Sequence, residues 1–244
     1  PMMERDAALA TIKKNLEELA MAITAGIGNA RVTRAFQNKD DALRLLVENN
    51  FVQIKIELSP VLRGTVYEPQ VIPVSESVEN EFGFAEIAVV SFANLYAGKI
   101  CAALDRQHPR DLFDILQLLN NEGITDDLRK AVLVYIISHP RPISELLRPN
   151  FKDISDIYDG EFLNMTEQDI SLLELETARE QLVSVINSSL TQQDRDFLLS
   201  FKNRDPDWSL LGLSGIENLP AVSWKQHKPD EMYRQKPTNA YTRL

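Results

Sequence analysis

The chain has 244 residues, 44% of them hydrophobic and 25% charged, with a formal net charge of −10. A chain of this length buries enough surface to fold without disulfides or metal ions, and its acidic excess argues against a surface that coats nucleic acid through general positive charge. Its single cysteine, Cys101, excludes a disulfide framework and fits a reducing cytoplasm, and no apolar run is long enough to span a membrane.

The first ninety residues are predicted to combine helix and strand. Apolar residues recur at helical spacing from Arg5 to about Ala25, and Gly26 then ends the helix. Strands are expected at 31–36, 42–47 and 51–58, with a hairpin turn at Asn49-Asn50 before the third. A long loop from 60 to 82 and a short strand at 85–90 complete this part.

The third strand has one apolar and one polar face. Its apolar residues alternate with Gln53, Lys55 and Glu57, so these three side chains point the same way. Such alternation is typical of a sheet with one face in solvent. The other interpretation makes Glu57 a carboxylate that faces a metal site.

Helices are predicted to dominate from Ser91 onward. We expect them at 92–104, 109–121, 125–138, 143–147, 167–188 and 192–202. Thr125 and Thr191 are placed to cap two of them, and Gly123 to end another. The predicted organisation is therefore α+β, with an α+β part at 1–90, a helical region at 91–204 and an irregular tail at 205–244.

The helix that opens at Pro109 has two aspartates three residues apart. Proline suits the first helical position, and Asp111 in the first turn is favoured by the helix dipole. Asp114 lies beyond that turn, where we expect an ion pair with Arg110 four residues earlier. A carboxylate pair beside basic residues also suits a metal ion or a phosphate-bearing substrate, although the spacing alone is a weak signal.

A lysine, Lys99, interrupts the small and apolar run Ala97–Ala103 of the preceding helix. It either extends to solvent or points into a cleft, where its point charge would suit a phosphate. Arg106 and Arg110 follow closely, so basic side chains gather at the connection between the two helices.

Residues 91–115, SFANLYAGKICAALDRQHPRDLFDI, are more specific together than any part of them. A helix that carries a lysine, followed by Arg-Asp-Leu-Phe-Asp at the start of the next helix, resembles the conserved centre of the AbiEii/AbiGii family. Members of that family are nucleotidyltransferase-like toxins of bacterial abortive-infection and toxin–antitoxin systems. The strand segment Ile54-Lys55-Ile56-Glu57 resembles the strand that precedes this motif, so the resemblance runs from about residue 5 to at least residue 120.

The resemblance implies a partial nucleotidyltransferase-like sheet followed by helices, and a role for each matching position. Lys99 matches the catalytic lysine, and Asp111 and Asp114 match the acidic residues of the last motif. Arg106, Arg110 and Lys55 are then expected to bind substrate, and Glu57 to bind metal. The implied reaction transfers nucleotides from a nucleoside triphosphate, with Mg²⁺, to an RNA such as tRNA, and a cognate antitoxin is an expected partner.

One departure from the family pattern concerns its first motif, Gly-Ser followed by Asp-x-Asp, which holds the metal-binding carboxylates. The sequence contains no Gly-Ser dipeptide. We therefore expect a fragment whose metal-binding front end lies upstream of Pro1, and an inactive one, since two-metal phosphoryl transfer needs those carboxylates. Two alternatives remain: a non-catalytic scaffold that binds an antitoxin or RNA, and an unrelated helical binding protein, in which Lys99, Asp111 and Asp114 would point to separate solvent faces.

Overall fold

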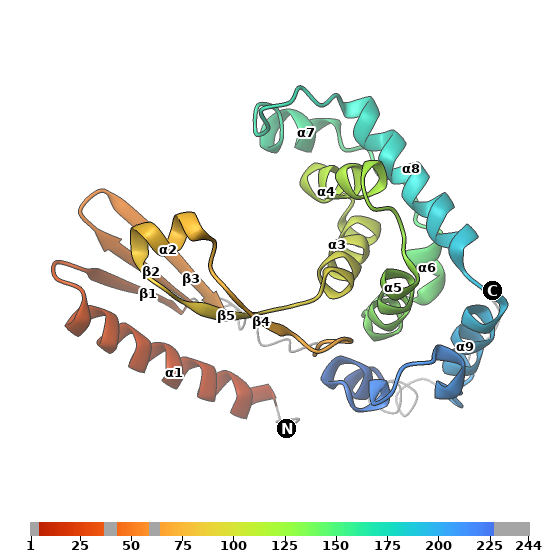
Figure 1. Ribbon diagram of the computed structural model, residues 1–244, viewed down its shortest axis with the longest axis horizontal. Helices are drawn as coiled ribbons and strands as arrows, with labels where there is room; N and C mark the ends of the chain where they lie inside the picture. Colours follow the sequence, from red (N-terminus) through yellow and green to blue (C-terminus); the bar gives the residue numbers. More distant parts are fainter. Residues whose placement is uncertain (1–4, 37–42, 59–63, 227–244) are drawn as a thin grey trace. The chain divides into compact units, whose positions relative to one another are not determined.

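The computed structural model describes residues 5–36, 43–58 and 64–226 of the chain (Figure 1). By their internal contacts the residues divide into two compact units, 1–62 and 63–244. The predicted division placed the first boundary near residue 90.

The first unit contains a helix and an antiparallel sheet. In chain order its elements are α1 (Arg5–Gly26), β1 (Arg31–Phe36), β2 (Leu43–Asn49) and β3 (Val52–Leu58). The strands pair in the order β1-β2-β3, and Asn50, with φ 54°, makes the predicted turn between β2 and β3. The helix and all three strands were predicted from the sequence, and their positions are confirmed to within one or two residues.

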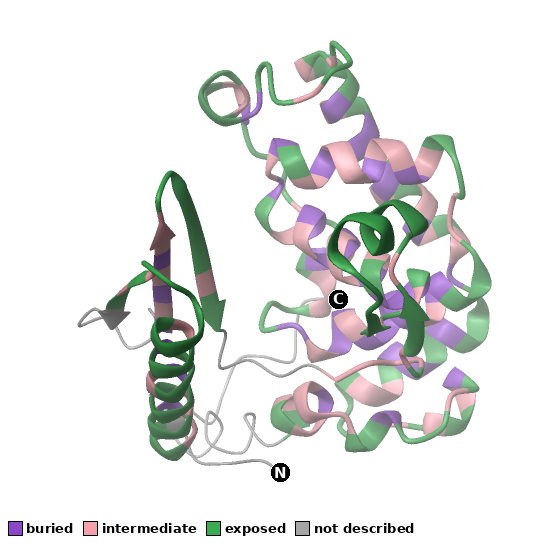
Figure 2. Ribbon diagram, turned by 60° about the vertical axis from the view of Figure 1, so that its left-hand side comes forward, coloured by how far each residue is buried: buried purple, intermediate pink, exposed green. Residues whose placement is uncertain are grey.

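The core of this unit lies between α1 and the sheet. Figure 2 shows the buried residues alternating along β2, as a strand with one covered face requires. Leu9, Leu16 and Ala20 of α1 form one buried cluster with Leu43 and Leu45 of β2. Helix α1 contacts β1 and β2, whereas Val52 and Ile54 of β3 are exposed.

The second unit begins with a small exposed sheet and a short helix. Strands β4 (Gln70–Pro73) and β5 (Glu86–Val89) pair antiparallel, and α2 (Glu76–Phe82) connects them. Figure 2 shows this segment almost entirely exposed. The prediction of a continuous loop from Pro60 to Phe82 is therefore wrong for 70–82. A helix without a buried face has no apolar period in its sequence, which explains the error.

Helices form the rest of the described chain. They are α3 (Phe92–Arg106), α4 (Pro109–Asn120), α5 (Asp126–Ser138), α6 (Ile143–Leu147), α7 (Ser155–Glu161), α8 (Leu172–Ser189) and α9 (Gln192–Lys202). Helix α3 packs against α5 and α4 packs against α8, as Figure 1 shows. Five of these helices were predicted with nearly the same bounds. The sequence missed α7, and α8 begins at Leu172 instead of 167.

Two clusters of apolar side chains hold the helices together. The larger one is centred on fully buried residues of α3, α4 and α5, among them Ile100, Leu112, Ile115, Leu118, Leu128 and Ile136. The smaller one joins α5 and α9 to the chain that follows α9, through Leu133, Ile137, Phe197, Leu211 and Val222. Most of the helical stability therefore comes from packing of these apolar faces.

Polar side chains define where several of these helices begin. The Thr125 hydroxyl accepts a hydrogen bond from the backbone N–H of Leu128, and Gly123, at φ 67°, follows the end of α4, as predicted. Thr191 and Asp194 form a reciprocal capping box at α9. Ser171 and Glu174 form another, which explains why α8 begins later than the apolar pattern indicated.

The segment after α9 contributes to the core. It was expected to be part of an irregular tail, but it contains two 3-10 turns, Trp208–Leu211 and Ile216–Asn218. Leu211, Ile216 and Val222 are buried. The described residues are thus mixed helix and sheet with a helical C-terminal region, as predicted, and none of their helices has the length and apolar character of a membrane span.

Candidate functional site

The candidate site lies on the outward face of α3, where it meets α4. Helix α3 begins at Ser91, whose hydroxyl accepts a hydrogen bond from the Asn94 backbone N–H. Its apolar side, which includes Ala97 and Ile100, is buried in the helical core. Lys99 is left between that core and solvent.

A sharp turn connects α3 to α4. Gln107 ends α3 in the left-handed region, at φ 56°, and its buried side chain bonds to the segment near residue 150. His108 caps α4, because its Nδ1 accepts a hydrogen bond from the Arg110 backbone N–H. Pro109 occupies the first helical position, as predicted. The turn therefore places the first residues of α4 beside the last residues of α3.

Lys99 and Asp114 form an ion pair across the two helices. The Lys99 Nζ lies 2.5 Å from Asp114 Oδ2, and the two side chains are 32% and 35% exposed. Lys99 is thus neither fully extended into solvent nor enclosed. The prediction that Asp114 pairs with Arg110 is wrong, since a partner fifteen residues away on the neighbouring helix is nearer to it.

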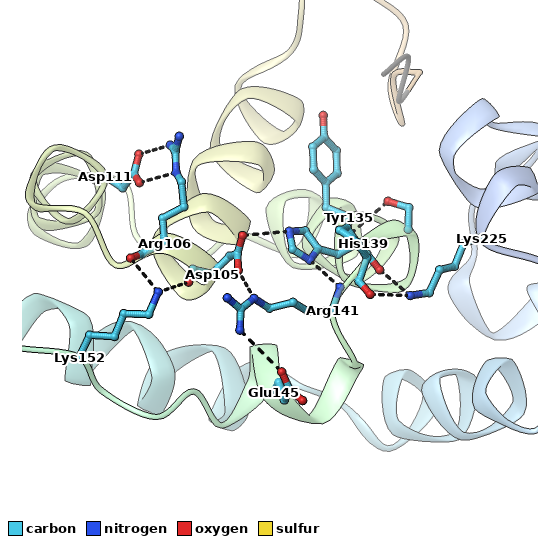
Figure 3. A network of polar contacts seen from close by, with 11 residues as sticks. Asp105, Arg106, Asp111, Tyr135, His139, Arg141, Glu145, Lys152 and Lys225 are labelled. Atoms are coloured by element: carbon cyan, nitrogen blue, oxygen red, sulfur yellow. Dashed lines mark hydrogen bonds and ion pairs between the residues drawn. The ribbon is translucent and has the colours of Figure 1, made fainter. Parts of the chain in front are cut away.

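Arg106 and Asp111 form a second ion pair across the same turn. Arg106 donates from Nε and Nη2 to the two carboxylate oxygens of Asp111, at 3.0 Å and 2.7 Å (Figure 3). The parallel donors of a guanidinium match a carboxylate well. Asp111 is largely buried and Arg106 is 62% exposed, so the cation is the accessible partner.

Arg110 and His108 both contact a third acidic residue, Glu161 at the end of α7. The Arg110 Nη2 and the His108 Nε2 each lie 3.2 Å from Glu161 Oε2. The hydrogen bond from His108, more than any other contact, lowers the pKa of Glu161. Arg110, expected to bind substrate, therefore lies on the α7 side of α4, in contact with Glu161.

Sequence reasoning missed a polar network at the C-terminal end of α3 (Figure 3). The Asp105 carboxylate accepts a hydrogen bond from Arg141, and His139 Nε2 lies 3.8 Å from it. Lys152 Nζ donates to the backbone carbonyls of Asp105 and Arg106, at 3.1 Å and 3.3 Å. These residues are far apart in the sequence, so no local pattern predicts the network. The Lys152 ammonium group supplies hydrogen bonds to free backbone carbonyls at the C-terminal end of α3, beside the site.

The two predicted residues of β3 lie in the first unit. Lys55 Nζ and Arg44 Nε lie 3.2 Å and 3.7 Å from the carboxylate of Glu57, and all three side chains are about half exposed. This arrangement is the one that strand alternation predicts for a solvent-facing side of a sheet. Their predicted roles in binding metal and substrate stay predictions.

A divalent metal ion requires several oxygen ligands at one point. Among the described residues, no group of three or more acidic, histidine or cysteine side chains could hold one. Glu57, Asp111 and Asp114 each contact a cationic side chain instead. The described residues therefore do not fit Mg²⁺ by themselves, and the groups here that suit a phosphate are the cationic side chains.

Comparisons with known proteins agree with this fold. The sequence model of a family described as nucleotidyl transferase AbiEii toxin, type IV toxin–antitoxin system, matches residues 3–225. The solved structure of MenT4, a nucleotidyltransferase toxin from Mycobacterium tuberculosis H37Rv, is similar with a TM-score of 0.53 over 87% of this chain and 74% of MenT4, at 12% identity. That likeness concerns the fold. No curated protein matches the chain.

Proposed function

Because the chain belongs to the AbiEii family of nucleotidyl transferase toxins of type IV toxin–antitoxin systems, we propose that the intact protein transfers a nucleotide from a nucleoside triphosphate to RNA, with tRNA as the expected class of acceptor. A hydroxyl oxygen of the RNA would attack the α-phosphorus. The bond from that phosphorus to the pyrophosphate would break, and the hydroxyl proton would pass to solvent. Negative charge accumulates on the departing pyrophosphate, so catalysis depends on cations held in position.

The observation that carries this proposal is the Lys99–Asp114 ion pair. Its ammonium group is half-buried and held by one carboxylate at 2.5 Å. Lysine is a compact point charge that suits phosphate oxygens, and partial burial strengthens its field. We assign Lys99 as the catalytic residue that contacts the triphosphate. Asp114, expected to be catalytic, becomes a positioning residue that holds the ammonium group before the substrate arrives.

Arg106 supplies a second cation, which a carboxylate also holds in position. It lies seven residues after Lys99, two helical turns farther along the same side of α3. Asp111 binds both donors of its guanidinium and thereby fixes its orientation. We assign Arg106 to phosphate binding and Asp111 to positioning it.

The remaining partners are proposed more generally. The family implies a nucleoside triphosphate and a divalent metal ion, and Mg²⁺ is the ion we expect. No step above passes through that ion, because the described residues do not fit it. A cognate antitoxin and a cytoplasmic location follow from the toxin family and stay predictions.

The proposal is tested by binding and transfer in parallel. The protein is incubated with an α-³²P-labelled nucleoside triphosphate, Mg²⁺ and total tRNA, and both retained nucleotide and labelled RNA are measured. We expect Lys99→Ala to abolish nucleotide retention and any transfer. Lys202→Ala, at the exposed end of α9, is the matched control and should change neither.

Three outcomes distinguish the interpretations of the sequence. Nucleotide retention that does not depend on Lys99 would contradict the proposal and favour the scaffold alternative. Retention through Lys99 without transfer is the result that the predicted upstream metal-binding motif requires. Transfer by this chain would contradict that prediction instead.

A further inference from the structure

The exposed side of α3 carries an aromatic pair next to the Lys99 site. Phe92 and Tyr96 lie one turn apart, with ring centroids separated by 4.4 Å and planes inclined by 37°. Tyr96 packs partly against the helical core, whereas Phe92 is 39% exposed. Tyr96 is thus anchored by the core, and Phe92 is the more accessible of the two rings.

These rings and the lysine share one side of the helix. Tyr96 is three residues before Lys99 and Phe92 is seven before it, and both spacings bring side chains to the same face. Two turns of helix measure about 10.5 Å. That length is comparable with the separation between the base and the terminal phosphates of an extended nucleotide. Leu95, also exposed, widens the apolar part of this surface.

The charged residues change from acidic to basic at Lys99. Residues 64–98 contain no lysine or arginine and five glutamates. Lys99 and Arg106 are the first two cationic side chains after that stretch. The face of α3 is therefore apolar and aromatic over its first turns and cationic over its later turns, and this order matches a ligand with a flat apolar ring at one end and negative charge at the other.

We propose that the Phe92–Tyr96 pair is a stacking platform for the nucleobase of the nucleoside triphosphate whose phosphates bind at Lys99. This inference rests on the proposed function and adds the part of the site that recognises the nucleoside. Stacking on an aromatic face is sequence-tolerant, because every base has a π-face. The platform therefore accepts all four bases and strengthens binding without selecting among them.

The test separates the base from the phosphates. Binding of ATP, CTP and inorganic tripolyphosphate is measured by calorimetry for the wild-type protein and for Phe92→Ala, Phe92→Trp and Lys99→Ala. We expect Phe92→Ala to weaken both nucleotides by roughly tenfold, as loss of one base–aromatic stack does, and to leave tripolyphosphate unchanged. Phe92→Trp should restore nucleotide affinity, and Lys99→Ala should weaken all three ligands.

A fluorescent probe provides a direct signature of stacking. The triphosphate of 2-aminopurine riboside loses emission when its base stacks, so wild type and Phe92→Trp should quench it and Phe92→Ala should not. Phe84→Ala, which removes another exposed phenylalanine from the same unit, is the matched control and should behave as wild type. Thermal unfolding of each variant shows that it is folded.

Each other outcome overturns the platform. If Phe92→Ala lowers the unfolding temperature but not nucleotide affinity, the ring is covered by another part of the chain and binds no base. If wild type binds tripolyphosphate through Lys99 as tightly as ATP, the phosphate site of the proposed function survives and the platform does not. If neither ligand depends on Lys99, both proposals fail.

Discussion

Removing the carboxylate of Asp114 should have opposite effects on stability and on phosphate binding. Asp114 contacts Lys99 at 2.5 Å, so a phosphate that binds Lys99 must compete with it. Asp114→Asn keeps the shape of the side chain and removes the charge. The ammonium group then has no charged partner, which destabilises the fold and leaves Lys99 free for a ligand.

The size of both effects follows from the exposure of the pair. About a third of each side chain is exposed, which is between a surface pair and a buried one. Surface pairs contribute about 0.2–1 kcal/mol, so we take the upper end, about 1 kcal/mol. That corresponds to a loss of about 2–4 °C in Tm for a chain of this size. In the variant this free energy is no longer lost when the ligand displaces Asp114, so the affinity for tripolyphosphate should rise about fivefold.

Thermal unfolding and calorimetry with tripolyphosphate, without Mg²⁺ and at low salt, measure the two effects. Asp159→Asn makes the same charge change on the exposed side of α7 and serves as the control. Lys99→Met should weaken binding at least tenfold, and the double variant should bind like Lys99→Met. If Asp114→Asn instead weakens binding as much as Lys99→Met does, then the role of Asp114 in orienting Lys99 outweighs its competition with the ligand, and the expected tightening is refuted.

Two further predictions concern the body that holds the site. Burial, followed by the charge of Asp127, raises the pKa of Tyr67 from 10.0 to about 12. The contribution of the neutral Tyr67 side chain to stability is therefore complete below pH 10 and is lost as the pH rises through 12. Urea unfolding should show this loss in wild type but not in Tyr67→Phe, and an equal loss in both proteins would contradict the prediction. Ile115→Ala removes a fully buried side chain and should lower the free energy of unfolding by about 2–5 kcal/mol in the same assay, whereas a cost near zero would show that the larger cluster is not tightly packed.

Helices with a buried face could be predicted from the sequence, whereas α2 and α7, which have no buried residue, could not. The bounds of α4 and α9 followed from Pro109, Thr191 and the apolar period between core positions. Helix α2 has no buried residue, so its sequence contains no periodic signal, and the pairing of β4 with β5 depends on residues more than ten positions apart. A helix shows an apolar period only where one of its faces is buried, so the period does not predict a helix that is exposed on all sides.

The candidate site was predicted residue by residue but not contact by contact. The sequence proposed Lys99, Asp111 and Asp114 as site residues, and their roles stay predictions, but the rule for neighbours on one helix wrongly assigned Asp114 to Arg110. The observed partner, Lys99, belongs to another helix, and its position depends on the turn at Gln107. Cross-helix pairs of this kind depend on tertiary packing, which a single sequence does not specify.

The backbone at Gln107 has a consequence for how the site acquires its shape. Its left-handed conformation at φ 56° would suit glycine better, but glycine would lose the buried amide that bonds to Asn150, Lys152 and Arg179. With glutamine, three hydrogen-bond partners hold the turn in this conformation. The turn that places Lys99 and Arg106 beside α4 is therefore ordered when the chain folds rather than when a ligand arrives, so its conformational entropy is not lost on binding.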